Sequence, residues 1–424
     1  MAEKQNNFDI VIVGGGLAGA SLALALADSP YKVAMIEAVD AVATSQPSYD
    51  DRTLAVAWTS CRILETLGIW DDLSSSATAI EEIFVSELNR PGKVQLHAPD
   101  MGFKNFGSVI EARAIGAALL NRLETVSNLS RFCPARLISM HTGEDEVTLH
   151  CQLESEEIKL TTRLVVAADG ARSSIREMLG ISTKIHDYQQ TAVIANVTPE
   201  KPHKNRAFER FTQTGPLAIL PHVGDRCGMV WTVPSGEEQT LLALSDEEIL
   251  SRLNQRVSPQ TRELLGSFVK IGRRSSYPLY LVQPQTNLAP RVVLIGNAAH
   301  AIHPNSAQGF NLALRDGAAL AEVLIEQYSG DAGCAKQLQT YDQWRQPDQR
   351  ETIRYSDGLA RLFANPGWLA GLVRGGGIAL HELFPPLKRK LALGAMGFRG
   401  RLPKLARGET PVNAKVSDNR GQKA

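Results

Sequence analysis

Three glycines near the start of the chain have the spacing of a phosphate-binding turn. Within FDIVIVGGGLAGASLALALADSPYKVAMIEA, Gly14, Gly16 and Gly19 make the pattern G-x-G-x-x-G. Glycines at these positions allow a tight turn, let the backbone approach a pyrophosphate, and permit close packing of a helix on a strand. The N-terminus of that helix offers unpaired N–H groups and a positive dipole end to the anion. Glu37 lies close to the expected offset of about 20 residues, where a carboxylate accepts hydrogen bonds from ribose hydroxyls.

A βαβ unit must hold these residues in place. The apolar run at 8–13 predicts a strand, the Ala- and Leu-rich stretch after the turn predicts a helix, and 32–37 predicts a second strand. With strand, helix and acid in register, the pattern predicts a dinucleotide site rather than a structural turn alone. An acid at Glu37 favours an unphosphorylated ribose, and therefore FAD or NAD over NADP, but it does not separate those two.

Two later stretches carry polar residues directly after apolar runs. LVVAADGARSSIREMLG places Asp169 and Gly170 after a predicted strand, with Ser173 and Arg176 following. VLIGNAAHAIHPNSAQGFNLALRD, residues 293–316, predicts a buried strand, a Gly-Asn turn, a loop with proline and then a helix. An ordinary turn after a buried strand is the alternative for each.

Together the three stretches resemble the fingerprints of the group A flavoprotein monooxygenases, the aromatic hydroxylases of the p-hydroxybenzoate hydroxylase type. Their second fingerprint is D-G-x-x-S-x-x-R, and their third is G-D-A-x-H followed by Pro and G-x-N. The resemblance covers residues 1–365 and implies FAD as cofactor, with its ADP end on the first turn and its ribitol and flavin end on the downstream loop and helix. The implied cofactor-binding residues are Gly14, Gly16, Gly19, Glu37, Arg52, Arg113, Asp169, Gly170, Gly296, Asn297, Pro304, Gly309 and Asn311.

Four of the positions singled out by this resemblance need comment. Arg52 and Arg113 resemble the family's two flavin-side arginines, with exposed surface arginines as the alternative. Asn297 stands where the family usually has Asp, and Ala307 where it usually has Gly. The Asn297 amide can accept from a ribitol hydroxyl only without charge assistance, so we expect weaker flavin retention. Ala307 restricts positive φ in a loop that should run close to the flavin.

The stretch 206–234 alternates apolar and polar residues as a sheet does, in the region where the family inserts its substrate domain. It resembles the ubiquinone-pathway branch, especially the 2-octaprenyl-6-methoxyphenol hydroxylases of the UbiH type. The resemblance implies that reduced FAD captures dioxygen as a 4a-hydroperoxide and that one oxygen atom enters the ring of a polyprenylated (methoxy)phenol. The reductant would be NAD(P)H or a protein electron donor, and a multi-enzyme ubiquinone-biosynthesis complex is an implied partner. We assign no catalytic residue, because the chemistry belongs to the cofactor.

We expect an α/β fold with a Rossmann-type FAD-binding domain, an inserted β-sheet substrate domain and a helical C-terminal region. The expected boundaries are 1–75, 101–180 and 276–365 for the discontinuous FAD-binding domain, 76–100 and 181–275 for the substrate domain, and 366–424 for a basic helical C-terminal region with a frayed tail.

Composition argues against several other classes of protein. With 424 residues, 43% of them hydrophobic, the chain has the make-up of a globular protein of about two domains. Its 45 basic residues balance 45 acidic ones, so no overall charge favours nucleic acid. The five cysteines are far apart and fit a reducing, cytoplasmic setting. No uninterrupted apolar run approaches the roughly 20 residues of a membrane span.

A basic stretch near the C-terminus suggests contact with a membrane surface. Residues 383–408 contain Lys388, Arg389, Lys390, Arg399, Arg401, Lys404 and Arg407 and no acid. Basic residues among apolar ones suit an anionic bilayer surface, with a solvated helical cap or a partner-docking site as alternatives. His300 and His303 have a spacing that metal ligands can have, but no carboxylate motif accompanies them, so we expect loop packing and no metal.

Two other functions stay open at this point. One is a non-catalytic flavoprotein-fold scaffold of a biosynthetic assembly, a reading kept open by Asn297 and Ala307. The other is a flavin reductase or disulfide oxidoreductase, which the lack of a second G-x-G-x-x-G pattern and of a close cysteine pair disfavours.

Overall fold

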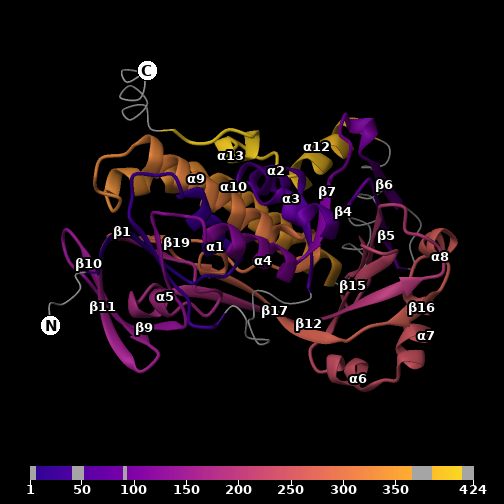
Figure 1. Cartoon of the computed structure of the whole chain (residues 1–424). Coiled ribbons are helices and arrows are strands. Elements are labelled where there is room, and N and C mark those ends of the chain that lie inside the picture. The colour runs from indigo at the N-terminus through magenta and orange to yellow at the C-terminus, as the bar shows by residue number, and fades with distance from the viewer. Residues whose placement is uncertain (1–5, 41–51, 89–92, 365–383, 413–424) are drawn as a thin grey trace.

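The computed structural model describes residues 6–40, 52–88, 93–364 and 384–412. Their strands form two large sheets and one small sheet, and the two large sheets lie toward opposite ends of an elongated molecule (Figure 1). The arrangement confirms the predicted α/β fold, with a Rossmann-type sheet, a separate β-sheet domain and helices at the C-terminal end.

The first large sheet is the Rossmann-type sheet. Its strands are β1 (Asn6–Val13), β2 (Val33–Ile36), β8 (Leu129–Phe132), β9 (Ala135–Thr142), β10 (Val147–Leu153), β11 (Glu156–Ala167), β18 (Leu288–Ala289) and β19 (Val292–Leu294). The parallel order β19-β11-β1-β2-β8 forms its centre, and the antiparallel pair β9 and β10 extends from β11. Ile10, Val11 and Ile12 are fully buried, as expected for a parallel strand covered on both faces. The strands predicted at 8–13 and 32–37 are β1 and β2.

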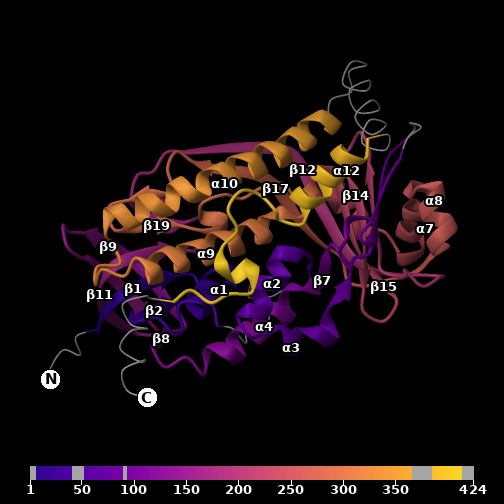
Figure 2. The ribbon, with the colours of Figure 1, turned by 90° about the horizontal axis from the view of Figure 1, so that it is seen from above.

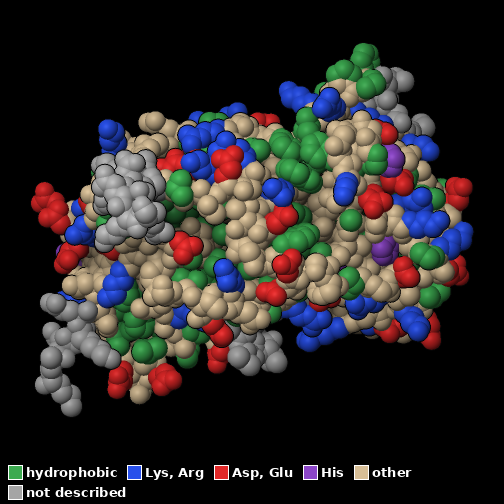
Figure 3. Space-filling view, turned by 45° about the horizontal axis from the view of Figure 1, so that its top comes forward, with side chains coloured by type: hydrophobic (Ala, Val, Ile, Leu, Met, Phe, Trp, Pro, Cys, Tyr) green, Lys and Arg blue, Asp and Glu red, His purple; other side chains and the backbone are tan. Residues whose placement is uncertain are grey.

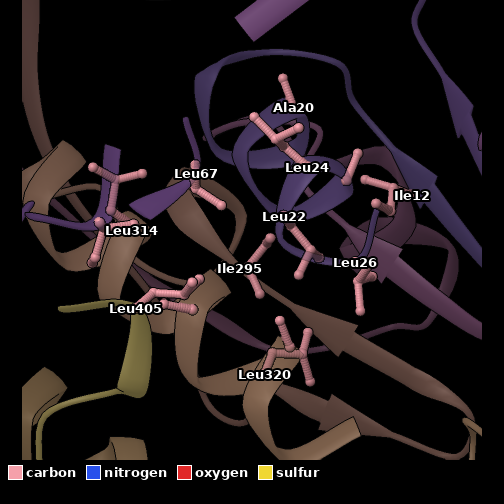
Figure 4. Close-up of a cluster of buried hydrophobic side chains, with 14 of the residues drawn as sticks. Ile12, Ala20, Leu22, Leu24, Leu26, Leu67, Ile295, Leu314, Leu320 and Leu405 are labelled. Carbon is pink, nitrogen blue, oxygen red and sulfur yellow. The ribbon is translucent and has the colours of Figure 1, made fainter. Parts of the chain in front are cut away.

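Helices bury one side of this sheet in a single aliphatic core. They are α1 (Leu17–Ala25), α2 (Trp58–Thr66), α3 (Trp70–Leu73), α4 (Ala112–Leu123), α9 (Gln308–Glu326) and α10 (Ala335–Ala364). Leu22 of α1 and Leu320 of α9 meet Ile12 and Ile295 there (Figure 4). Full burial of such a side chain contributes roughly 1.5–3 kcal/mol, so this core fixes α1 and α9 against the strands that they follow. The short helix α5 (Ser174–Met178) contributes Ile175 to a separate cluster.

The second large sheet forms the other end of the molecule. Its strands are β5 (Glu82–Glu87), β6 (Lys93–His97), β12 (Thr183–Pro199), β13 (Arg206–Phe211), β14 (Leu217–His222), β15 (Arg226–Pro234), β16 (Phe268–Ile271) and β17 (Ser275–Pro284). The alternation at 206–234 correctly predicted strands, which are β13, β14 and β15. Three helices, α6 (Glu237–Ala243), α7 (Asp246–Arg256) and α8 (Pro259–Leu265), contribute to the core on one face, where Phe208 and Met229 pack with Ile249.

A small sheet and the C-terminal helices connect the two ends. The sheet consists of β3 (Thr53–Ala57), β7 (Gly107–Glu111) and β4 (Thr78–Ala79), and the helices are α12 (Pro385–Ala395) and α13 (Lys404–Arg407). Helix α10 runs from the first sheet toward the second, where α12 lies (Figure 2). Leu405 of α13 belongs to the core around α1 and α9, while Ala392 of α12 packs with Ala207 of the second sheet.

Parts of the predicted C-terminal region, 366–383 and 413–424, lie outside the described residues. Within the described ranges, every helix is too short or too polar to cross a membrane.

Candidate functional site: a dinucleotide cradle at three strand ends

The three sequence motifs follow three neighbouring parallel strands. The glycine turn follows β1, Asp169 lies just beyond β11, and Gly296 just beyond β19. The amide of Ala168 donates to the carbonyl of Val13 at 2.8 Å, and the amide of Ile295 donates to Ala167 at 2.9 Å. Because parallel strands end at the same edge of a sheet, the downstream strand, loop and helix return to the first turn, as expected.

The glycine turn has no room for side chains. A Cβ atom on Gly14 would overlap the carbonyl group of Ala168, and Gly14 has a φ of +106°. A Cβ atom on Gly19 would overlap the carbonyl oxygen of Gly14. Gly16 is the N-cap of α1, so the first N–H groups of that helix lie at the turn. The turn therefore has the close backbone approach and the positive helix end that a pyrophosphate requires.

Glu37 lies directly against this turn. The amide of Gly15 donates to Glu37 Oε2 at 2.6 Å, and the amide of Val39 donates to Oε1 at 2.8 Å. A carboxylate has about four lone-pair positions, so both oxygens can also accept from hydroxyl groups. The position fits the ribose contact expected from the sequence.

The second motif braces the third. Ser173 caps α5 by accepting from the amide of Arg176 at 3.1 Å, and Gly170 has a φ of +86°. The buried guanidinium of Arg176 donates to the carbonyls of Ala171 at 2.7 Å and Ala298 at 2.9 Å. Arg176 therefore fixes the turn after β11 to the turn after β19.

Asp169 is the second-motif residue with unused bonding capacity. Its Oδ2 accepts from Ser174 Oγ and from the amide of Ile175, both at 3.2 Å. Its Oδ1 is buried and has no hydrogen-bond partner in the described structure. A buried carboxylate oxygen without a donor is costly, and a ligand hydroxyl or amide would satisfy it.

The third motif begins with a short 3₁₀ turn, η3 (Gly296–Ala298). Gly296 has a φ of +58°, and a Cβ atom there would lie 3.0 Å from the Cβ atom of Ala18 in α1. Asn297 is exposed at the same edge, and Pro304 is exposed in the next turn, η4 (Pro304–Ser306). The structure thus leaves the Asn297 amide available to a ligand beside the first helix turn of the glycine motif.

Gly309 and Asn311 lie in the first turn of α9 and differ in environment. A Cβ atom on Gly309 would make only ordinary contact with Ile302, so the glycine is not required by crowding. Asn311 is buried, and its side-chain oxygen accepts from the amide of Ala57 at 2.8 Å while its nitrogen donates to Ala55 at 2.9 Å. Asn311 therefore ties α9 to β3, a role that the sequence motif alone did not reveal.

Ala307 adopts the left-handed conformation, a point that the sequence left open. Its φ is +50° and its ψ is +28°, at the N-cap of α9. This conformation costs an L-residue other than Gly roughly 1–2 kcal/mol. The departure from Gly at this position is therefore a strained one.

Arg52 and Arg113 emerge at the same end of the small sheet. The amide of Ala112 donates to the carbonyl of Arg52 at 2.9 Å, next to the Thr53–Glu111 pair of the β3–β7 ladder. The Arg52 guanidinium lies 5.0 Å from the ring centre of Tyr277 in β17. Arg113 is largely exposed and donates to Glu111 Oε2 at 2.8 Å. Both arginines therefore lie where the small sheet meets the second large sheet.

A buried ionic cluster behind the third motif was not recognised in the sequence. Arg315 Nε donates to Asp348 Oδ2 at 2.9 Å, and Arg345 donates to Asp316 Oδ1 and Asp348 Oδ2, both at 2.6 Å. His300 Nε2 lies 2.7 Å from Asp316 Oδ2. Burial works against a charged Asp316, but the charges of Arg345 and His300 outweigh it and lower the pKa of that carboxyl. The signal available in the sequence was an Arg-Asp pair inside an otherwise apolar helix.

The two histidines of the third motif have separate partners. His303 Nδ1 accepts from the amide of Asn305 at 3.1 Å, so its proton lies on Nε2 and is donated to Gln190 Oε1 at 3.2 Å. Burial lowers the pKa of His303 to about 4, which keeps the ring neutral. With His300 held by Asp316, the two rings serve loop packing.

The predicted basic surface is smaller than the sequence suggested. Arg399 pairs with Glu351 at 2.5 Å, Arg401 with Glu322 at 2.6 Å, Lys404 with Glu326, and Arg407 with Glu409 at 3.2 Å. We define the α12 surface as exposed Arg389 and Lys390 together with Phe384, which has 55% of its surface exposed. Figure 3 shows hydrophobic side chains beside Lys and Arg side chains over this region.

These residues fit FAD. The crowded glycine turn, the carboxylate of Glu37, the unsatisfied oxygen of Asp169 and the exposed amide of Asn297 line one edge of the sheet. Such a set combines a pyrophosphate cradle with acceptors for hydroxyl groups, which are the polar groups of an adenine dinucleotide with a ribitol chain.

Comparison with known proteins agrees with this reading. A family model described as FAD binding domain matches residues 7–356. The chain is 38% identical to an uncharacterised protein of Synechocystis over 412 residues, covering 96% of this chain and 97% of the relative. It is 36% identical to the ubiquinone hydroxylase UbiL of Rhodospirillum rubrum over 406 residues, covering 94% and 92% of the two chains. The crystal structure of p-nitrophenol 4-monooxygenase PnpA from Pseudomonas putida is 18% identical and superposes with a TM-score of 0.75, covering 94% of this chain and 100% of that one.

Proposed function

The chain belongs to the FAD-dependent aromatic hydroxylases, and from this premise we propose that it hydroxylates a polyprenylated (methoxy)phenol in ubiquinone biosynthesis. The observation that carries the proposal is the 36% identity to a ubiquinone hydroxylase over 94% of the chain. Within that pathway, we favour a substrate of the 2-octaprenyl-6-methoxyphenol type, because 206–234 resembles the corresponding branch of the family.

Different residues at the ends of the parallel strands would bind different parts of FAD. The glycine turn and Glu37 would bind the ADP part, and Asn297, Pro304 and Gly309 the ribitol and flavin part. FAD, when bound and reduced by NAD(P)H or a protein electron donor, supplies with dioxygen the oxygen atom that enters the ring. The protein must orient that ring and keep water away from the reacting atoms.

We propose that the α12 surface brings the enzyme to its lipid-soluble substrate. Arg389 and Lys390 suit the charge of an anionic bilayer, and Phe384 suits its apolar boundary. Each basic residue near such a surface contributes about 1 kcal/mol. The protein would then act at the cytoplasmic membrane surface, alone or in a multi-enzyme ubiquinone-biosynthesis complex.

Oxygen incorporation tests the proposed reaction. The protein is loaded with FAD, reduced anaerobically, mixed with a short-chain 2-prenyl-6-methoxyphenol, and exposed to ¹⁸O-labelled dioxygen. We expect one labelled oxygen atom in the ring. Peroxide release without ring oxidation, while a simpler phenol is hydroxylated, would reject the prenylated substrate and leave the hydroxylase class in place.

Charge reversal tests the α12 surface better than removal of the C-terminus does, because Leu405 and Ala392 belong to the hydrophobic core. We expect the double variant R389E/K390E to lose most of its partitioning to vesicles that contain anionic lipid, with unchanged FAD content. The matched control K159E/K184E reverses two exposed lysines on β11 and β12. Equal partitioning of the two variants would remove the membrane proposal.

A further inference from the structure

One row of side chains crosses five neighbouring strands of the second sheet, from β5 to β12. Val85, Glu209, Ala218, Val230 and Ile194 lie directly opposite one another on β5, β13, β14, β15 and β12. Paired residues on neighbouring strands point to the same face, so these five side chains form one straight line. Glu209 is the ionisable member of an otherwise aliphatic row.

This row faces the helices α10 and α12. Ala207 and Phe211 flank Glu209 on the same face of β13, because side chains alternate along a strand. Ala207 packs with Ala392 and Met396 around α12, and Phe211 stacks on Phe363 of α10 with ring centres 3.7 Å apart. Phe208, on the opposite face, packs with the helices α6 to α8.

All five residues of the row are partly exposed, although the face is covered by α10 and α12. The next residues along β13 on that face, Ala207 and Phe211, are buried. On β13, Glu209 is therefore a partly exposed position between two buried neighbours, where solvent, or a ligand in its place, reaches the strand.

The Glu209 side chain has an unsatisfied oxygen among the residues that the structure describes. Its Oε1 is buried and accepts no hydrogen bond in the described structure. Burial raises the pKa of this carboxyl group to about 8, and no basic residue counteracts it. At neutral pH the group is therefore mostly protonated, with one O–H donor and one carbonyl acceptor to offer.

Helix α10 connects this face of the sheet with the third motif. Its Phe363 stacks on Phe211 of β13, which lies two residues from Glu209 on the same face of the strand. Two turns earlier in α10, Ser356 Oγ lies 3.0 Å from both the carbonyl oxygen of His303 and Asn305 Oδ1. The face that carries Glu209 is thus joined through α10 to the loop expected to hold the flavin.

The unsatisfied carboxyl group of Glu209, on an otherwise apolar face, would be stabilised by a hydrogen bond from a polar ligand atom. We propose that the Glu209 carboxyl group hydrogen-bonds the ring hydroxyl of the aromatic substrate, with the aliphatic row contacting the ring and its apolar substituents. The proposal rests on the proposed function, and it identifies the phenol oxygen as the group that this face recognises. A hydroxyl can both donate and accept, so it matches both halves of a protonated carboxyl group. Glutamine offers the same pair of functions, whereas leucine offers neither.

Ligand pairs that differ by one hydroxyl group test the proposal. Binding is measured on FAD-loaded protein from the perturbation of the flavin spectrum, using 2-prenyl-6-methoxyphenol, 2-methoxyphenol and phenol, each beside its analogue without the hydroxyl. We expect the wild-type protein to bind each phenol about tenfold more tightly than its analogue without the hydroxyl. This affinity ratio should stay within about threefold of the wild-type ratio in E209Q, and it should fall to about one in E209L. The control E82L removes a carboxyl group on β5 that already has a partner, Arg206, and should keep the wild-type preference.

The outcomes separate this proposal from the proposed function. An E209L protein that retains FAD and still prefers the phenols tenfold overturns the role of Glu209. A preference lost equally in E209Q and E209L also overturns it, because glutamine should support the contact. A preference for phenols that is lost in E209L and kept in E209Q supports the role of Glu209. If only the simple phenols bind, that result still supports the role of Glu209 but counts against the prenylated substrate. A wild-type protein that binds none of the phenols overturns both proposals.

Discussion

Arg176 donates a hydrogen bond of 2.9 Å to the carbonyl oxygen of Ala298, and this bond joins the second sequence motif to the third. Arg176 and Ala298 are 122 residues apart in the sequence, but the strands that precede them, β11 and β19, are adjacent in the sheet. Its other contact, to Ala171, holds its own turn. Arg176 of the second motif thus positions two turns of the proposed cofactor site by bonding to their backbone carbonyl groups.

Replacing Arg176 should therefore weaken FAD binding without removing a direct ligand. We expect R176M to raise the Kd for FAD about tenfold and to lower the free energy of unfolding by about 2–3 kcal/mol, since two buried carbonyl groups lose a charged donor. Flavin fluorescence titration and thermal unfolding measure the two effects. R172M changes an exposed arginine in the same segment and should behave like the wild type. Equal FAD affinity in both variants would contradict the bracing role.

Relief of strain at Ala307 should stabilise the protein. With a φ of +50°, the residue occupies a conformation that glycine adopts without a side-chain penalty. We expect A307G to raise the free energy of unfolding by about 1 kcal/mol, measured on FAD-free and FAD-loaded protein. The control A117G, at an exposed site in the middle of α4, should lower it by about 1 kcal/mol. Destabilisation by both changes would show that the loop does not hold Ala307 in this conformation.

Asn297 is exposed at the cofactor edge, so a charge can be added there without burying it. A carboxylate accepts stronger hydrogen bonds from hydroxyl groups than an amide does. We expect N297D to lower the Kd for FAD severalfold, as seen by retention of the flavin during dilution and gel filtration. Weaker retention in N297D would mean that Asn297 meets a hydrogen-bond acceptor or a negative charge instead.

The local part of the cofactor edge was readable in the sequence. Spacing alone identified the glycine turn and Glu37, because their geometry depends on one βαβ unit. The family resemblance also implied that the downstream strand, loop and helix return to the first turn, and the parallel pairing of β19, β11 and β1 brings them there.

Contacts between segments that are distant in the sequence could not be predicted from it. From the sequence, Arg401 and Lys404 were expected to belong to an exposed basic surface. In the structure they pair with Glu322 and Glu326, because α13 packs beside α9. Alternation at 206–234 predicted strands but not which face of β13 would meet α10. Charge and periodicity describe one segment at a time, whereas these contacts depend on how distant segments pack.

The buried ionic cluster should dominate stability at low pH. Burial opposes charge on Asp348, but Arg315 and Arg345 outweigh it and hold its pKa well below the usual range. Because the folded-state values of Asp316 and Asp348 are depressed, their stabilisation is present above the ordinary value of 3.8 and is lost as pH falls below it. We expect D348N to lose about 3–5 kcal/mol at pH 7, since two buried arginines lose their shared partner.

Denaturant unfolding at pH 7 and at low pH measures this effect, and the deficit of D348N should shrink on acidification. The control E351Q, on the same helix as Asp348, removes a largely exposed carboxylate that pairs with the mostly buried Arg399, and it should cost clearly less than D348N. Equal losses in the two variants would contradict a special role for the buried cluster.

Glu209 should impose the opposite dependence on pH. Its pKa is raised from 4.5 to about 8 in the folded chain, so folding retains a proton that the unfolded chain releases. The stabilisation is complete below pH 4.5 and is lost as pH rises toward 8, with a slope of up to about 1.4 kcal/mol per pH unit. In E209Q no such proton is lost, so its stability should match that of the wild type near pH 4.5 and exceed it increasingly up to pH 8.

Unfolding of FAD-loaded protein across this range gives the difference curve, with E82Q expected to follow the wild type. A difference between E209Q and the wild type that stays constant with pH would mean that Glu209 is charged and solvated, and that the sheet face has no neutral acid to offer a phenol.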